Sequence, residues 1–374
     1  MDSRAVVTPP YVGRPLRLEP FHALRLNPRR VGDPAARRLF ARPYRAVAVR
    51  LSQWQERGQL RRDAEPALWL HEYTEAGMTV RGLVGALDVS HRAQSPGDRA
   101  VLPHEGIHPA QADSLADRMT QLALNPAPIL LVHRAPQAVR RLVHQIAATE
   151  PTDDFGDRNG QRHRIWSIRD AEVLSGLAEG LAGCQALIAD GHHRYAAYLR
   201  MQAREPGGAF DRGLAMLVDQ EDTPLFLGPI HRVLTGVSLE DLTAAAEIAG
   251  AGNDAANRAS AMEALGPHTL VATDGKAWAT LKLHLLADRA AVEALHDDVV
   301  PALGRGPARI HHHHSVEATL NQLRRSGGVA VLMPAPDVDV VLRVAAADRL
   351  LPEKATSFQP KPSPGVLIRS LRDG

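Results

Sequence analysis

Apolar runs bounded by turn residues predict a series of strands and helices in the N-terminal half of the chain. Residues 67–73 and 78–87 have the character of two strands joined by the turn Glu75-Ala76-Gly77. The other strands expected here are 128–133, 165–168 and 214–218, and the expected helices are 51–60, 113–124, 137–149 and 170–181. Residues 90–112, rich in proline, glycine and histidine, form a loop long enough to be functional.

The pattern over residues 186–204 predicts three consecutive elements. Residues 186–189 are a short apolar strand, Asp190 and Gly191 form a turn, and a helix follows over 192–204. Its residues Tyr195, Tyr198, Leu199 and Gln202 fall on one side of that helix. A strand, a tight turn and a helix start are therefore expected in direct succession.

A second series of elements begins near residue 236. Ser238 opens a helix with Asp241 three residues later, a short-acid version of the capping box. Residues 269–273 and 277–284 flank Asp274-Gly275, which is typical of a tight hairpin. Further helices are expected at 292–303, 316–325 and 338–347, and further strands at 308–311, 329–333 and 366–369.

These elements predict an α/β protein of mixed α+β character. A length of 374 residues exceeds what one small core usually organises, so two units are expected. The larger unit, 1–235, would carry the strand, turn and helix of 186–204. The smaller α/β unit, 236–374, would contain the hairpin 269–284 and a tail, 352–371, that closes over the site.

The composition is that of an ordinary globular protein. Hydrophobic residues make up 44% of the chain and charged residues 23%, with a formal net charge of +2. Aromatic residues are only 4%, and the arginine doublets are dispersed among acidic neighbours, so we expect no nucleic acid as a partner.

Cysteine usage and hydropathy indicate a cytoplasmic protein. The single cysteine, Cys184, excludes an internal disulfide. Apolar stretches are far shorter than a membrane span requires, and no signal-peptide pattern is visible, so no membrane association is expected.

The segment ADGHHRY, residues 189–195, is the strongest candidate for chemistry. The first N–H groups of a helix favour an anion, and Gly191 lets the backbone approach a phosphate closely. His192, His193 and Arg194 add donors in the first turn, where cations oppose the helix dipole unless an anion is bound. The alternative is an ordinary strand-to-helix junction with solvated polar residues.

Two other histidine motifs suggest metal binding less strongly. His104-Glu105-x-x-His108 has zinc-hydrolase spacing, but Gly106 and the flanking prolines disfavour the helix that this spacing requires. The alternative is a loop that presents an imidazole and a carboxylate for acid–base chemistry. His311–His314 leave a strand, whose alternating faces favour a polar strand end over a metal site.

The motif IADGHHRY, residues 188–195, resembles the signature of the family named domain of unknown function 1015. Residues 21–31 (FHALRLNPRRV), 101–105 (VLPHE), 162–168 (RHRIWSI) and 352–371 (PEKATSFQPKPSPGVLIRSL) follow in the order of that family. His231 and Arg232 also match it. The resemblance therefore extends over nearly the whole chain.

The DGHHR turn is also distantly similar to the superfamily that contains sulfiredoxin, chromosome-partitioning proteins and free serine kinases. This resemblance implies a small-molecule anion or nucleotide as partner, and phosphoryl transfer from ATP or ADP, with Mg²⁺, to a small hydroxylated metabolite such as serine. The residues that it implies as catalytic are Asp190, His192, Glu105 and His104. Those that it implies for phosphate or nucleotide binding are Gly191, His193, Arg194, Tyr195, His231, Arg232, Lys354, Thr356 and Lys361.

The chain departs from the family pattern at several charged positions. Arg45 stands where the family has an acid, in a segment that reads RPYR. Gly106, Ala110 and Ser114 occupy a region where relatives carry basic residues. Three functions therefore stay open: a small-molecule kinase, a non-catalytic nucleotide or anion-binding protein, and a zinc hydrolase through His104, Glu105 and His108.

Overall fold

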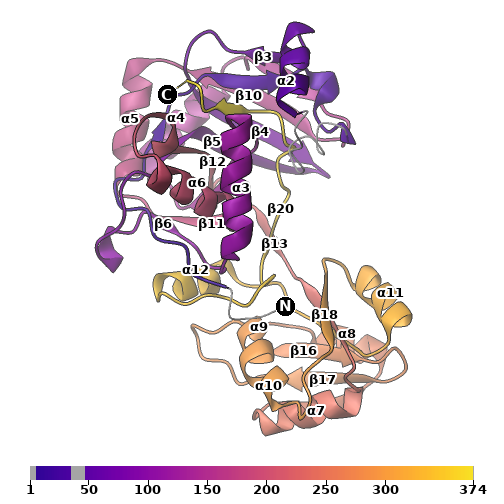
Figure 1. Cartoon of the computed structure of the whole chain (residues 1–374). Coiled ribbons are helices and arrows are strands. Elements are labelled where there is room, and N and C mark those ends of the chain that lie inside the picture. The colour runs from indigo at the N-terminus through magenta and orange to yellow at the C-terminus, as the bar shows by residue number, and fades with distance from the viewer. Residues whose placement is uncertain (1–5, 35–46, 374) are drawn as a thin grey trace. The chain divides into compact units, whose positions relative to one another are not determined.

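The structure, a computed structural model, describes residues 6–34 and 47–373. These residues form two compact units (Figure 1). Unit 1 contains residues up to 103, 107–225 and 360 onwards, and unit 2 contains 104–106 and 226–359. The mixed α/β class, with a larger and a smaller unit, is confirmed. The division falls at 225 and again at 359, where the sequence suggested a single boundary at 235. Arg45 and its RPYR segment lie outside the described residues.

Unit 1 is built from short helices and two sheets. Its strands are β1 (Leu18–Glu19), β2 (Ala23–Leu26), β3 (Leu60–Arg62), β4 (Leu68–Glu75), β5 (Met78–Asp88), β6 (Val101–Leu102), β7 (Leu124–Asn125), β8 (Ile129–His133), β9 (Asp153–Gly156), β10 (Arg162–Ile168), β11 (Ala186–Asp190), β12 (Arg212–Asp219) and β21 (Ile368–Ser370). Its α-helices are α2 (Val47–Glu56), α3 (Pro109–Leu122), α4 (Gln137–Ala147), α5 (Ala171–Ala182) and α6 (His192–Arg204), with 3-10 turns η2 (Pro28–Arg30), η3 (Pro96–Asp98) and η4 (Gly208–Asp211).

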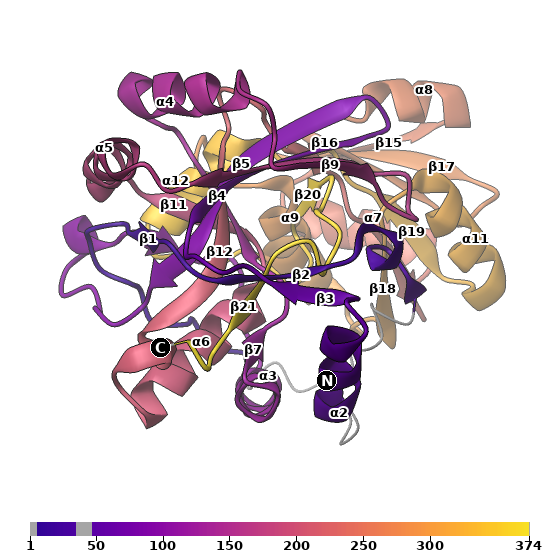
Figure 2. The ribbon, with the colours of Figure 1, turned by 90° about the horizontal axis from the view of Figure 1, so that it is seen from above.

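The main sheet of unit 1 has the order β6-β11-β8-β12-β5-β4-β10-β9, with β1 paired to β5. Figure 2 shows α4 and α5 on one side of this sheet and α3, α6 and the small sheet β3-β2-β21-β7 on the other. The strands β8 and β11, which are continuous apolar runs, lie next to each other near one edge and are buried. This arrangement brings the C-terminal end of β11 and the start of α6 to that part of the sheet.

Helix α6 packs closely on β12. Tyr195, Tyr198 and Leu199, three residues of the predicted apolar stripe, are 0%, 1% and 4% exposed. The close approach depends on Gly213 of β12, because a Cβ there would lie 2.2 Å from Cδ2 of the Tyr198 ring. The Tyr198 hydroxyl donates to the carbonyl of Leu214, 3.2 Å away.

Unit 2 is a second, smaller α/β layer. Its strands are β13 (Phe226–Gly228), β14 (His231–Thr235), β15 (Gly252–Ala256), β16 (Thr269–Thr273), β17 (Trp278–Lys282), β18 (Arg309–His313), β19 (Val329–Leu332) and β20 (Ser357–Gln359). Its helices are α7 (Leu239–Ile248), α8 (Arg258–Ala264), α9 (Ala291–Glu293), the π-helix η5 (Ala294–Val299), α10 (Val300–Ala302), α11 (Val316–Ser326) and α12 (Val338–Ala346).

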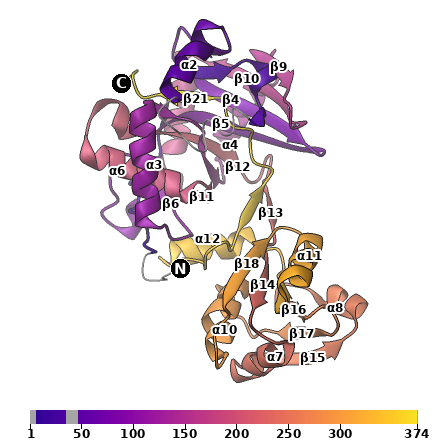
Figure 3. The ribbon, with the colours of Figure 1, turned by 45° about the vertical axis from the view of Figure 1, so that its right-hand side comes forward.

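The main sheet of unit 2 has the order β15-β17-β16-β19-β14-β18 (Figure 3). The hairpin of β16 and β17 and the capping box of Ser238 and Asp241 are confirmed. Asp274 shapes the hairpin turn, since its Oδ1 accepts from the backbone N–H groups of Lys276 and Ala277, each at 2.8 Å. The turn has four residues instead of the two expected, because the pairing closes between Thr273 and Trp278.

The strand β9 was not expected, because residues 152–164 are polar. In the structure β9 pairs with β10 at the edge of the main sheet, where its residues alternate between half-buried and exposed. An edge strand needs few apolar residues, so its pattern resembles a loop. Among the described residues, the helices fall short of the length and apolarity that a bilayer crossing demands.

We predict that Gly213→Ala lowers the free energy of unfolding by about 1–3 kcal/mol, the usual cost of overpacking a filled core. The added methyl would meet the buried ring of Tyr198. Gly156→Ala, in strand β9, is the control, because a Cβ there meets nothing within 4 Å. Chemical denaturation of both variants tests this, and equal stabilities would contradict the proposed contact.

Candidate functional site

The turn between β11 and α6 has the local geometry that the sequence predicts. β11 ends at Asp190, and α6 begins at His192 with Gly191 as its N-cap at φ +97°. A Cβ on Gly191 would lie 3.0 Å from Cγ2 of Ile129 and 3.1 Å from Nε of Arg194. Glycine therefore meets two needs here, a left-handed backbone and close packing.

The carboxylate of Asp190 is held between two cations. Its Oδ2 accepts a hydrogen bond from Nη2 of Arg194, and its Oδ1 lies 2.5 Å from Nζ of Lys361. The side chains of Asp190 and Lys361 are 28% and 46% exposed, so a solute can reach this ion pair. The structure thus brings together Asp190, Arg194 and the tail lysine, as the sequence suggested.

Arg194 also bonds to the backbone of unit 1. Its Nη1 donates to the carbonyl oxygens of Ala127, at 3.2 Å, and Pro128, both just before β8. The sequence suggested a guanidinium available to grip a phosphate through two bonds. In the structure the group lies over Gly191 and is engaged by Asp190 and two carbonyls of its own chain, and its part in phosphate binding stays a prediction.

The helices α3 and α6 lie side by side with their N-termini together. His108, the N-cap of α3, donates its backbone N–H to Nε2 of His193, 3.1 Å away, and their rings stack at 6.0 Å. One to two turns further on, Asp113 of α3 pairs with Arg200 of α6, so the helices run parallel. Neither first turn contains an acidic residue, and both helix starts carry partial positive charge. The region therefore favours an anion.

Tyr195 and His192, in the first turn of α6, are buried. The Tyr195 hydroxyl donates to the carbonyl of Pro10 at 2.8 Å and accepts from the N–H of Val12 at 2.9 Å. Burial also raises the pKa of Tyr195. This hydroxyl anchors an N-terminal segment, and the part of Tyr195 in phosphate binding stays a prediction. His192 is 7% exposed, and its catalytic role stays a prediction.

Hydrogen bonds from Tyr73 of β4 and from Gln161, which directly precedes β10, hold the tail, and Lys361 with it, near the turn. The Tyr73 hydroxyl donates to the carbonyl of Pro360 at 2.8 Å. The side-chain amide of Gln161 donates to the carbonyl of Lys361 at 2.8 Å, and its oxygen accepts from the N–H of Ser363 at 2.9 Å. Lys361 is therefore placed by its backbone, while its ammonium group points to Asp190.

A chain of buried polar groups lies in the same part of unit 1. Nε2 of His71 is 3.0 Å from Nδ1 of His163, whose Nε2 is 3.3 Å from Oδ2 of Asp157. Burial, and then the neighbouring His163, lower the pKa of His71, and burial also lowers that of His163. The sequence did not indicate this series of hydrogen-bonded side chains, because its members come from two strands and a turn.

The remaining predicted residues gather in unit 2. Nε2 of His104 lies 2.7 Å from Oγ1 of Thr356, and that hydroxyl donates to Oε1 of Glu105 at 3.3 Å. Burial raises the pKa of Glu105, while the charge of Lys354 and hydrogen bonds from Thr356 oppose the rise. A carboxyl with a raised pKa is suited to exchange a proton.

His231 and Arg232 open strand β14 of the same unit. Nδ1 of His231 accepts from the N–H of Met333 at 3.0 Å, and burial lowers the pKa of His231 to about 4. Arg232 donates to the carbonyls of Ile230 and, at 3.0 Å, Lys354. His296 and His312, which the sequence did not single out, lie close enough to Arg232 that its charge lowers their pKa values further, after burial.

The zinc-hydrolase alternative is wrong. Residues 104–108 are extended, with bridges from Glu105 to Leu351 and from Ile107 to Val7, and α3 starts only at Pro109. His104 and His108 therefore do not project from one helix face, as the motif requires. Within residues 6–34 and 47–373, no three His, Cys, Asp or Glu side chains converge as a metal site, those of His311–His314 included.

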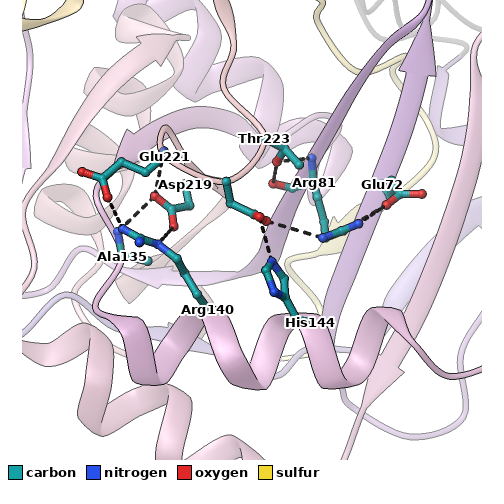
Figure 4. Close-up of polar contacts among 9 residues, drawn as sticks. Glu72, Arg81, Ala135, Arg140, His144, Asp219, Glu221 and Thr223 are labelled. Carbon is teal, nitrogen blue, oxygen red and sulfur yellow. Dashed lines mark hydrogen bonds and ion pairs between the residues drawn. The ribbon is translucent and has the colours of Figure 1, made fainter.

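An ion-pair network at the end of β12, which the sequence did not suggest, joins β12, β5 and α4 (Figure 4). Oδ2 of Asp219 lies 2.6 Å from Nε of Arg140, and Asp222 contacts His144 at 2.7 Å and Arg81 at 3.4 Å. Acidic and basic groups alternate through the network, so it contributes cohesion more than an open binding surface.

His133, the last residue of β8, lies opposite Asp219 of β12 in the sheet. It is 6% exposed, and its Nδ1 has no hydrogen-bond partner among the described residues. Burial lowers its pKa to about 4, with Asp219 opposing the shift and Arg140 adding to it.

Comparison with known proteins supports the family expected from the motifs. The sequence profile of a family described as "protein of unknown function (DUF1015)" matches residues 12–301. No protein with a curated description matches the chain.

Several solved structures resemble the chain at low identity. A conserved hypothetical protein from Pyrococcus furiosus is 13% identical with a TM-score of 0.41, covering 73% of this chain and 93% of its own. A free serine kinase variant in complex with AMP is 12% identical with a TM-score of 0.43, covering 73% and 89%. SbnI with a C-terminal truncation, from Staphylococcus aureus, is 14% identical with a TM-score of 0.41, covering 72% and 83%.

We predict that His133 makes stability depend on acidity. Its pKa is about 4 in the folded chain and 6.5 ordinarily, so the unfolded chain binds the proton first as pH falls. Its contribution is fully present above pH 6.5 and is lost on descent to about pH 4. The loss in unfolding free energy is up to about 3 kcal/mol.

Denaturation of the chain and of His133→Gln across this pH range measures the effect, and the variant should lose less stability. His284→Gln, at an exposed position, is the control. Parallel pH profiles for the chain and His133→Gln would contradict the prediction.

Proposed function

The chain belongs to the DUF1015 family, whose function is unknown, and we propose that it is a nucleotide-dependent phosphotransferase. In this proposal residues 191–194 and Lys361 bind the nucleotide phosphates, and Asp190 accepts a proton. The acceptor is a hydroxyl group of a small metabolite. Serine is the first acceptor to test, because the DGHHR turn resembles that of free serine kinases.

The observation that supports the proposal most directly is the convergence of Lys361 and Arg194 on Asp190 at the start of α6. Two cations that already hold a carboxylate are suited to hold a phosphate oxygen in its place. The half-exposed Lys361 can move from the carboxylate to a phosphate without disturbing the core. The parallel starts of α3 and α6 add favourable potential for negative charge.

Phosphoryl transfer needs charge neutralisation and alignment more than covalent chemistry by the protein. The acceptor oxygen bonds to the terminal phosphorus as the bond from that phosphorus to the bridging oxygen breaks. The acceptor proton passes to Asp190, which Lys361 releases when it binds phosphate. Mg²⁺ enters as the ion carried by the nucleotide, and no described cluster of carboxylates offers it a separate site.

Nucleotide or anion binding without transfer is the second candidate. It is favoured by the double pairing of Asp190, because a carboxylate bound to two cations is a weak base. The absence of basic side chains at Gly106, Ala110 and Ser114, where relatives carry them, points the same way.

We predict that Lys361→Gln weakens ADP binding by at least about 10-fold, since it removes one charge-assisted hydrogen bond. The melting temperature should change little, because the lysine side chain is 46% exposed. Lys282→Gln is a matched control, since Lys282 also pairs with a carboxylate, Asp254, at 2.6 Å on an exposed surface. Isothermal titration calorimetry measures both, and equal ADP affinities in the two variants would remove the turn from the proposal.

Turnover separates the two candidates. Phosphorus NMR of the pure chain with ATP or ADP, Mg²⁺ and a panel of hydroxy amino acids should show a new phosphomonoester signal, with serine as first acceptor. Asp190→Asn should keep nucleotide binding but lose transfer, because the amide does not accept the proton. Nucleotide binding with no phosphomonoester for any acceptor would leave the binding function alone.

A further inference from the structure

Unit 2 contains a cavity of about 250 Å³ that the proposed function does not use. Its walls are largely aliphatic and include Ile230, Val292, Met333, Val340 and Ala355. A cavity of about 150 Å³ is sufficient for benzene, so this one accommodates roughly ten non-hydrogen atoms. The rim includes Leu286, an apolar side chain that is 74% exposed. The lining thus favours the apolar body of a small organic molecule.

Arg232 brings a positive charge to this lining. It is 1% exposed and lies on β14, between β18 and β19 in the sheet. Val233 packs with Leu323 of α11, and the alternation of the strand directs Arg232 to the other face, where its Nε lies 3.3 Å from Nε2 of His296. The guanidinium is thus held at a fixed position inside the unit.

The contacts of Arg232 include no ion pair with a carboxylate of the described residues. Its acceptors among the described residues are Nε2 of His296 and the carbonyls of Ile230 and Lys354, against five N–H groups. None of the ion pairs found among the described residues includes Arg232, and the carboxylate of Glu105 acts on it only through its charge, which raises the pKa of Arg232 against the effect of burial. A buried charge of this kind is costly until an opposite charge joins it.

The surroundings favour a single negative charge. Burial lowers the pKa of Arg232 to about 10, which leaves it charged at neutral pH, and lowers those of His296 and His312 to about 3 and 4, which leaves them neutral. Of the other charged residues of the lining, Arg289 is already paired with Asp298, at 2.7 and 2.8 Å, and Asp337 is exposed, with Oδ1 accepting from the N–H of Asp339 at the start of α12. The site thus offers one cation without an ion-pair partner. Its single positive charge balances the single negative charge of a carboxylate but only one of the two charges of a dianionic phosphate.

We propose that this cavity is a binding site for a small aliphatic or aromatic monocarboxylate, with the carboxylate on Arg232 and the apolar body against Ile230, Met333 and Ala355. The site is independent of the phosphate site proposed at the turn in unit 1.

Fluorine NMR of the full chain with 4-fluorophenylacetate tests the proposal, with the corresponding amide as an uncharged probe of the same shape. The acid should bind saturably and at least about 10-fold more tightly than the amide, the value of one charge-assisted contact. Arg232→Lys should weaken the acid by at least about 10-fold, since lysine cannot form the two-pronged contact. Excess ADP should leave the acid bound, whatever the outcome of the nucleotide experiments.

Ala355→Leu tests the cavity without altering the charge. Leucine would occupy part of the space and should abolish binding of the acid. Ala264→Leu, at an exposed position of α8, is the control and should bind as the unmodified chain does. Equal binding of acid and amide, unchanged binding in a folded Ala355→Leu variant, or no saturable binding of the acid would overturn the proposal.

Discussion

The carboxylate of Asp190 is the contact on which the geometry of the turn in unit 1 depends. It receives Arg194 from the first turn of α6 and Lys361 from the C-terminal tail. Through Arg194 the same cluster reaches the backbone carbonyls of Ala127 and Pro128, before β8. All three side chains are partly exposed, so these ion pairs position the segments more than they stabilise the fold. A strand end, a helix start, a loop and a tail are joined in this way at one point.

In unit 2 a buried guanidinium, that of Arg232, likewise joins separate segments. Arg232 joins the start of β14 to the segment before β20 through the carbonyls of Ile230 and Lys354. Arg194 and Arg232 differ in how their positive charges are balanced. Arg194 meets a carboxylate of its own chain, whereas Arg232 feels Glu105 only as a charge that raises its pKa against the effect of burial. Arg194 thus meets an anion of its own chain, whereas Arg232 lines a cavity.

Burial determines what many of the histidines contribute. It lowers the pKa values of His71, His163, His231 and His312, so these rings are neutral near pH 7. A neutral imidazole donates through one nitrogen and accepts through the other, which suits it to link buried groups. The chain from His71 through His163 to Asp157 is an example, since it joins two strands and a turn. At His71 and His163, buried histidine thus serves polar packing.

Local sequence was sufficient for elements whose causes lie within a few residues. An apolar run, Asp190-Gly191 and the stripe of Tyr195, Tyr198 and Leu199 predicted β11, the turn and α6, because strand burial, positive φ and helix periodicity are short-range effects. Family motifs also singled out Glu105, Thr356 and Arg232, whose functional roles stay predictions. Only the tertiary structure decided which partners the charged side chains contact. Lys361 reaches Asp190 across 171 positions, and Arg194 turns to two backbone carbonyls, because such partners depend on where strands and loops meet in space.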